Sequence, residues 1–185
     1  YYNQREDEYG GSLENRMRFL LEIYAEIRKL VGEDYPILVK LTASEFFDGG
    51  LTFAETRTIC KKLAAIGVDA IIISGNIHGN ANAVVGESFD GYTIQSEGYF
   101  REYGAVISQE VNVPIITVGG LADICAIEEI AASTNIQFFA LSRPLLAEPH
   151  LLKRWSEGST AEVDCERCSK CRTKRGNFCV VYKRR

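Results

Sequence analysis

Three groups of residues in this 185-residue chain have side chains whose types and spacing could do chemistry. The first is a lysine inside an otherwise apolar run, Ile37-Leu38-Val39-Lys40-Leu41. An ammonium group in such a strand is costly unless an anion or a dipole faces it. Lys40 could therefore stabilise negative charge on a bound ring, or it could pair with a neighbouring carboxylate for structure alone.

The second group consists of two short polar turns, Gly119-Gly120 and Ser142-Arg143. Each turn directly follows an apolar run and precedes a segment with helical periodicity. Glycine lets a ligand approach the backbone closely, and a following helix start offers unpaired N–H groups. Gly-Gly alone is typical of ordinary turn geometry, but two such turns in succession suit a phosphate, with Arg143 assisting.

The third group is the cysteine run Cys165-x₂-Cys168-x₂-Cys171-x₇-Cys179. Thiolates at this spacing can close around a metal ion or a cluster, and the basic residues between them would offset its negative charge. A [4Fe–4S] cluster, a zinc ion and no metal at all remain open from the spacing. The other two cysteines, Cys60 and Cys125, fall on helical patterns and are expected in the core.

These residues must be positioned by alternating helices and strands. Helical spacing or capping signals predict helices over residues 15–31, 52–66, 99–111 and 123–132, and a last helix from Pro149 through Trp155. Short apolar runs predict strands over residues 37–41, 70–74, 115–118 and 138–141. This alternation indicates a parallel α/β array of four βα units.

Four βα units are compatible with an open flavodoxin-like sheet or with half of a closed TIM (β/α)₈ barrel. In both folds the functional residues lie at the carboxyl ends of the strands. Lys40, Gly119-Gly120 and Ser142-Arg143 stand at three of these ends. His78 lies near the expected site in a long Gly- and Asn-rich loop over residues 75–98, whereas His150 at a helix start is expected to be structural.

Composition and charge narrow the function classes. The formal net charge is −4, but residues 165–185 carry +7 and the remaining residues −11. The acidic body would repel nucleic acid, whereas the basic tail could attract it. No apolar run approaches the roughly 20 residues of a membrane helix. We therefore expect a cytoplasmic protein. In that compartment its cysteines would be free thiols or metal ligands rather than disulfides. Because the sequence begins at Tyr1, we also expect it to be a piece of a longer chain.

The opening segment carries a more specific signal. Residues 3–19, NQREDEYGGSLENRMRF, closely resemble the signature after the fourth strand of Old Yellow Enzyme-type barrels, the NADH:flavin oxidoreductase family that includes 2,4-dienoyl-CoA reductases and trimethylamine dehydrogenase. The later runs VGGL and ALSRPLLAEPHLLKRW follow in the order typical of the family. Read from the residues alone, the segment is a polar loop pinned by Arg–carboxylate pairs.

The resemblance implies that residues 1–158 form the C-terminal half of an FMN-binding TIM barrel and that residues 159–185 form a Cys-rich basic tail. Lys40 would lie near the flavin ring, with Gly119, Gly120, Ser142 and Arg143 around its phosphate. In such relatives a similar cysteine run binds [4Fe–4S], which implies Cys165, Cys168, Cys171 and Cys179 as ligands. The usual catalytic residues would lie upstream of Tyr1, in the missing N-terminal half of the barrel.

The sequence thus predicts an FMN-dependent, ene-reductase-like oxidoreductase that uses NAD(P)H to reduce a small electron-poor alkene or related acceptor. The fragment alone is expected to be inactive. The alternative is a zinc-ribbon-like nucleic-acid-binding module built on the basic cysteine tail. Against this alternative, the thiols form one run rather than two separated knuckles, and the body is acidic.

Overall fold

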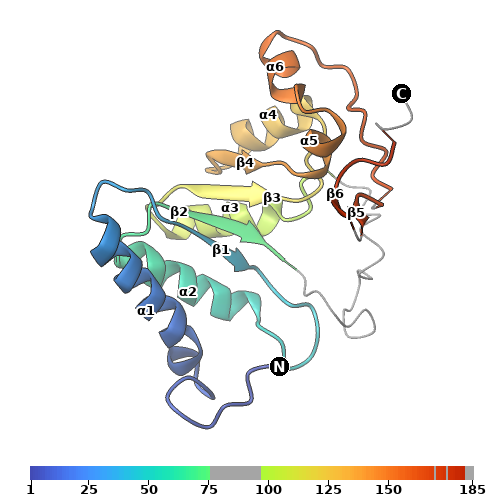
Figure 1. The fold of residues 1–185 in the computed structure, drawn as a ribbon. Coiled ribbons are helices and arrows are strands. Elements are labelled where there is room, and N and C mark those ends of the chain that lie inside the picture. Colours follow the sequence, from blue (N-terminus) through green and yellow to red (C-terminus); the bar gives the residue numbers. More distant parts are fainter. Residues whose placement is uncertain (76–96, 169, 174, 182–185) are drawn as a thin grey trace.

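The computed structural model describes residues 1–75, 97–168, 170–173 and 175–181 (Figure 1). Helices and strands alternate along the chain, and a small hairpin follows them. In chain order the elements are α1 (Leu13–Val31), β1 (Leu38–Thr42), α2 (Phe53–Ala65), β2 (Ala70–Ser74), α3 (Arg101–Glu110), β3 (Ile115–Val118), α4 (Ile124–Ser133), β4 (Phe138–Ala140), α5 (Arg143–Ala147), α6 (Leu151–Ser156), β5 (Arg172–Thr173) and β6 (Gly176–Asn177).

Local side-chain hydrogen bonds fix where the first two helices begin. The Ser12 hydroxyl accepts a hydrogen bond from the Asn15 backbone N–H at the start of α1. At the start of α2, Thr52 and Glu55 form a capping box in which each side chain accepts from the other residue's backbone N–H. These bonds satisfy N–H groups that have no partner within the helix.

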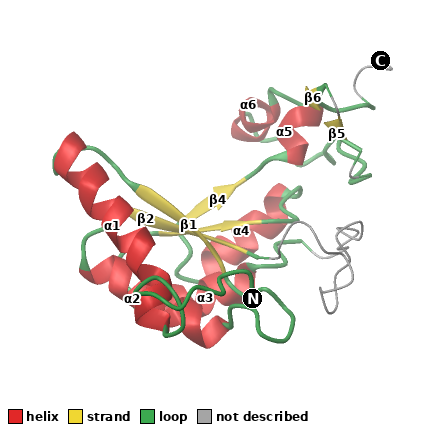
Figure 2. Cartoon of the chain, turned by 60° about the horizontal axis from the view of Figure 1, so that its bottom comes forward, coloured by secondary structure: helices red, strands yellow, loops and turns green. Residues whose placement is uncertain are grey.

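The four long strands pair in parallel in the order β1-β2-β3-β4. The register aligns Lys40 with Ile72, Ile72 with Ile116, and Ile116 with Phe138. Helices α1 to α4 lie along one side of the sheet (Figure 2). A flavodoxin-like sheet reverses its strand order at a switch point and has helices on both faces. The sequential order and single helical layer are those of consecutive units of a TIM barrel.

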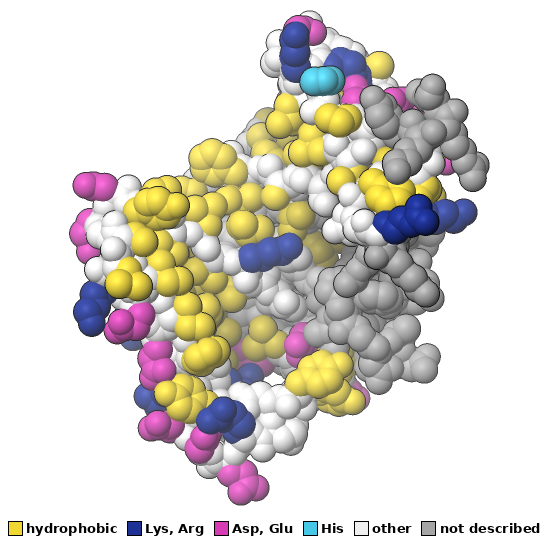
Figure 3. Space-filling model, viewed as in Figure 1, with side chains coloured by type: hydrophobic (Ala, Val, Ile, Leu, Met, Phe, Trp, Pro, Cys, Tyr) yellow, Lys and Arg dark blue, Asp and Glu magenta, His cyan; other side chains and the backbone are white. Residues whose placement is uncertain are grey.

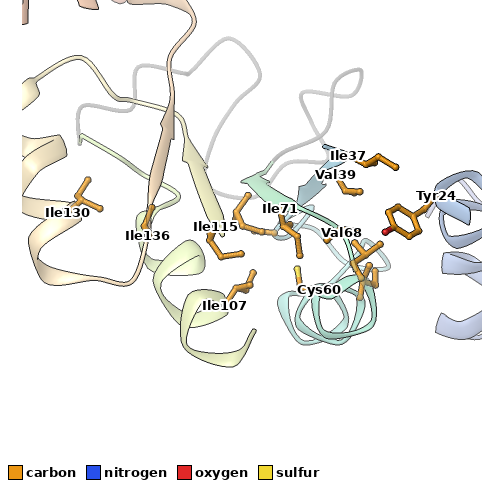
Figure 4. Close-up of a cluster of buried hydrophobic side chains, with 14 of the residues drawn as sticks. Tyr24, Ile37, Val39, Cys60, Val68, Ile71, Ile107, Ile115, Ile130 and Ile136 are labelled. Atoms are coloured by element: carbon orange, nitrogen blue, oxygen red, sulfur yellow. The ribbon is translucent and has the colours of Figure 1, made fainter. Parts of the chain in front are cut away.

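The core lies between this sheet and its helices. Strand residues such as Ile71 and Ile115 pack with Cys60 of α2 and Ile107 of α3, and all four side chains are fully buried (Figure 4). Tyr24 joins α1 to the same core, and its hydroxyl donates to the Gly67 carbonyl at 2.7 Å. Burial of these apolar side chains from both layers is the main stabilisation of the fold.

The N-terminal signature forms a polar network around the start of α1. The Asn15 side-chain amide donates to the Gly10 carbonyl at 3.0 Å, and the Arg18 guanidinium donates to the Glu8 carbonyl at 2.7 Å. Arg16 forms an ion pair with Glu55 of α2. These bonds hold the loop against the first two helices, so the described part of the signature has a structural role.

On the opposite face of the sheet, called the bare face below, no helix from the described residues covers the strands. Leu38 remains 48% exposed and Phe138 54% exposed, although both lie on strands. Figure 3 shows hydrophobic side chains gathered over this face of the molecule. Parallel sheets are normally covered on both faces. The bare face therefore corresponds to the side that points into the interior of a closed barrel.

The predicted α/β fold of four parallel βα units is confirmed, with element ends that differ by at most two residues from the expected ones. The short helix α5 and the hairpin β5–β6 were not predicted. No helix in the described part of the chain is long and apolar enough to cross a membrane.

Candidate functional site

An open pocket lies at the carboxyl ends of the strands. Its volume of about 890 Å³ is typical of small-molecule sites. Its walls come from the ends of all four long strands, from the segments that follow β2, β3 and β4, and from the cysteine tail. The residues that line it include Lys40, Ser74, Gly75, Tyr99, Phe100, Val118, Gly119, Gly120, Leu121, Ala140, Ser142, Arg143, Cys165, Arg167, Cys168 and Cys171.

Lys40 reaches the pocket from the bare face of β1. The strand alternates, so Val39 is buried toward the helices while Lys40 is exposed on the other side. No carboxylate in the described part of the chain forms an ion pair with the ammonium. The purely structural interpretation of Lys40 therefore finds no support among the described residues.

The turn after β3 has a backbone that requires glycine. Gly119 and Gly120 have φ values of +102° and +71°. A Cβ on Gly119 would lie 2.6 Å from the Tyr99 ring and 3.0 Å from the Phe100 ring. The two aromatic rings pack edge to face with their centroids 4.7 Å apart. This aromatic pair and the glycine backbone together form one wall of the pocket.

The turn after β4 faces the same space. Ser142 precedes α5, and Arg143 is its first residue. Both line the pocket together with Gly119 and Gly120. Glycine backbone, a hydroxyl, a guanidinium and the Lys40 ammonium are donors suited to an anionic ligand. This donor set and the glycine cradle fit a phosphate-bearing ligand such as FMN.

The cysteine tail closes another side of the pocket. Cys165, Cys168 and Cys171 line it, whereas Cys179 does not. Burial raises the pKa of the Cys165 thiol; the Arg167 backbone N–H and the Arg143 charge oppose that rise. The effect of burial on the pKa of Cys165 is thus larger than the opposing effect of its basic neighbours. The sequence had suggested that these neighbours would favour the thiolate.

The tail does not form a preassembled metal centre. Among the residues that the structure describes, no three His, Cys, Asp or Glu side chains are gathered closely enough to hold a metal ion. The four tail thiols have the donor chemistry of ligands for a cluster or zinc, but the described side chains are not gathered around one point.

The structure brings Lys40, Gly119, Gly120, Ser142 and Arg143 to one pocket, as the strand-end argument predicted. His78 lies outside the described residues, and His150 is exposed at the start of α6. Cys60 is buried as expected, whereas Cys125 is exposed, so its predicted core position is wrong. Sequence reasoning missed the aromatic wall of Tyr99 and Phe100, because neither ring belongs to a motif.

The fold and pocket define a protein of the (β/α) barrel class with an anion-suited site at the carboxyl ends of its strands. The profile of the NADH:flavin oxidoreductase / NADH oxidase family matches residues 1–162. An NADH oxidase from Thermoanaerobacter brockii is 38% identical over 170 residues, which cover 91% of this chain and 25% of that protein.

Two further similarities point the same way. A cinnamate reductase from Clostridium sporogenes is 32% identical over 203 residues, which cover 98% of this chain and 29% of that protein. A solved structure of 2-naphthoyl-CoA reductase in complex with 2-naphthoyl-CoA matches with a TM-score of 0.75 and 30% identity, over 91% of this chain and 25% of that one.

The chain therefore belongs to the NADH:flavin oxidoreductase / NADH oxidase family, as the resemblance of its N-terminal segment predicted. It spans about a quarter of the length of the relatives named above.

Proposed function

We propose that this chain provides the flavin-phosphate side of an FMN-dependent NAD(P)H oxidoreductase that reduces an electron-poor alkene or a related small acceptor. The observation that carries the proposal is the convergence of five residues from three strand ends on one pocket. Family membership supports FMN as the ligand and NAD(P)H as the reductant.

In this proposal the Gly119-Gly120 turn gives the flavin phosphate close access to backbone N–H groups. Ser142 and Arg143 bind the same phosphate from the next turn, and Lys40 places a positive charge beside the ring. Tyr99 and Phe100 exclude water from one side. Bound FMN would supply the hydride chemistry between NAD(P)H and the acceptor.

The acceptor class is supported by two relatives. One is named for the reduction of cinnamate, and the other is a reductase solved with 2-naphthoyl-CoA. Both names refer to conjugated, electron-poor compounds. We infer an acceptor of the same broad class for the protein that carries this chain.

We also infer that further βα units complete the barrel and that this chain is its C-terminal half. The exposed Leu38 and Phe138 on the bare face support this inference, as do the two sheet edges at β1 and β4 that pair with no further strand among the described residues. The catalytic side chains that hold and protonate the acceptor would then come from the missing half.

Residues 1–158 as barrel and residues 159–185 as tail remain the proposed division of the chain. The spacing of Cys165, Cys168, Cys171 and Cys179 supports metal ligation as a further proposal, with [4Fe–4S] before zinc. A cytoplasmic location suits a chain whose cysteines form no disulfide in the described structure. The zinc-ribbon alternative gains nothing from the geometry, because its tail packs at a small-molecule pocket.

The test is a titration with FMN of the longer protein that carries this chain, followed by NADH or NADPH and a simple α,β-unsaturated ketone. The proposal predicts saturable FMN binding, consumption of the reduced nicotinamide that depends on FMN, and saturation of the alkene. A protein that binds no FMN would refute the proposed function. A variant with Arg143→Gln should bind FMN more weakly than the wild type, because a charge-assisted phosphate contact is lost.

A further inference from the structure

The tail is fastened to the pocket by an ion pair between residues far apart in the sequence. The Arg167 guanidinium, between Cys165 and Cys168, pairs with the Glu97 carboxylate. The side chains are only 33% and 19% exposed, so this pair is more sheltered than an ordinary surface ion pair. Arg167 itself lines the pocket.

Glu97 also holds the turn that follows the Gly-Gly pair. Its second carboxylate oxygen accepts a hydrogen bond from the Ala122 backbone N–H at 2.8 Å. Ala122 comes three residues after Gly119, at the end of the turn before α4. The position of this carboxylate therefore bears directly on the position of the turn.

The same residue begins the aromatic wall. Glu97 is followed by Gly98, at φ +58°, and then by Tyr99 and Phe100, which pack against the Gly119 backbone. The Glu97 carboxylate thus contacts two walls of the pocket, the turn after β3 and the cysteine tail. The third wall, the aromatic pair, follows Glu97 directly in the sequence.

The backbone of Arg167 is held in an unusual conformation. Its φ is +53°, and among the described residues only one other non-glycine residue has a positive φ. Such a conformation is unfavourable for an L-residue and persists when surrounding contacts hold it. The ion pair with Glu97 is such a contact, because it holds the Arg167 side chain at the pocket.

We propose that Glu97 and Arg167 form a clasp that closes the cysteine tail over the pocket and thereby sets how tightly the flavin is held. Both are positioning residues, acting through the turn after β3 and through the tail. The inference rests on the proposed function for the identity of the ligand, but the clasp itself is a property of the protein without ligand.

Three variants separate the clasp from general effects of charge. Arg167→Gln removes the guanidinium, and Glu97→Gln keeps an oxygen for the Ala122 N–H while removing the charge. Lys170→Gln is the matched control, because Lys170 is an exposed base of the same tail that does not line the pocket. The readouts are the FMN dissociation constant, the FMN release rate, and the alkylation rate of Cys165 and Cys171 without FMN, measured by mass spectrometry.

The clasp predicts FMN binding about tenfold weaker in Arg167→Gln and Glu97→Gln, mainly through faster release, and no further loss in the double variant. The half-buried Cys165 and Cys171 should be alkylated faster in both variants, while Lys170→Gln behaves like the wild type. Equal alkylation rates in Arg167→Gln, Lys170→Gln and wild type would overturn the clasp. If wild type binds no FMN but alkylation still follows the prediction, the proposed function fails and the clasp stands.

Discussion

The sharpest structural prediction concerns Gly119, because an added methyl group there meets two separate obstacles. The φ of +102° is unfavourable for any L-residue by about 1–2 kcal/mol. The new Cβ would also lie 2.6 Å from the Tyr99 ring, which must move, and such overpacking costs about 1–3 kcal/mol. Gly119→Ala should therefore lower the free energy of unfolding by about 2–5 kcal/mol.

Gly158→Ala provides the matched control. Gly158 has a φ of +89°, but a Cβ there would meet nothing within 4 Å. This variant carries the backbone cost without the collision, so it should lose only about 1–2 kcal/mol. The difference between the two variants measures the crowding at the pocket wall.

Urea denaturation followed by circular dichroism gives both free energies, and FMN titration of each variant gives the second readout. Gly119→Ala should also weaken FMN binding, because Tyr99 is displaced from the wall, whereas Gly158→Ala should bind FMN like the wild type. Equal destabilisation by the two substitutions, together with unchanged FMN affinity in Gly119→Ala, would refute the geometry described for this turn.

Three further predictions concern charge and buried hydroxyl groups. Lys40→Met should disfavour the reduced, more anionic flavin by about 1–3 kcal/mol, which would be measured as a lower reduction potential. Lys40→Arg should largely preserve the wild-type potential. An unchanged potential in the methionine variant would place Lys40 away from the ring. The ion pair with Arg57 lowers the pKa of Glu110 to about 2, so its stabilisation is present above the ordinary pKa of 4.5 and is lost as pH falls toward 2. Acid titration of stability should show this loss in the wild type and a flatter profile in Glu110→Gln, and identical profiles would count against the pair. The fully buried Thr56 hydroxyl donates to a carbonyl of β1 at 2.9 Å, so Thr56→Val should lower the free energy of unfolding by about 1–3 kcal/mol. Thr117→Val should be neutral or stabilising, because the buried Thr117 hydroxyl has no partner among the described residues. Thermal unfolding that ranks the two variants the other way would contradict this assignment.

The helices and strands were largely predictable because their signals are local. The capping box of Thr52 and Glu55 depends on residues three apart, so the sequence alone locates the start of α2. Likewise the β-branched run over residues 70–74 can form a buried strand whatever surrounds it. The choice between barrel and open sheet was not local, since it depends on which strands pair and which face the helices cover.

Elements that depend on distant partners were missed or misplaced. The helix expected over residues 99–111 begins at Arg101, because Tyr99 and Phe100 form a turn that packs on the Gly119 backbone. Helix α5 has five residues, too few to show helical periodicity. The exposure of Lys40 on β1 likewise depends on which face of the sheet the helices cover.

The candidate site was predictable only in part. The rule that function lies at the carboxyl ends of parallel strands located Lys40 and the two polar turns. The position of the cysteine tail against the same pocket could not be foreseen, because it depends on the pairing of Arg167 with Glu97 across the fold. The roles of these residues toward FMN remain predictions for experiment.

The most direct test of the central claim is the anaerobic visible spectrum of the longer protein that carries this chain, recorded after incubation with FMN and removal of the unbound flavin. The account predicts a retained flavin band that is bleached by NADH or NADPH and recovers when an α,β-unsaturated acceptor is added. A colourless protein, or a bound flavin that neither reduced nicotinamide bleaches, would contradict it.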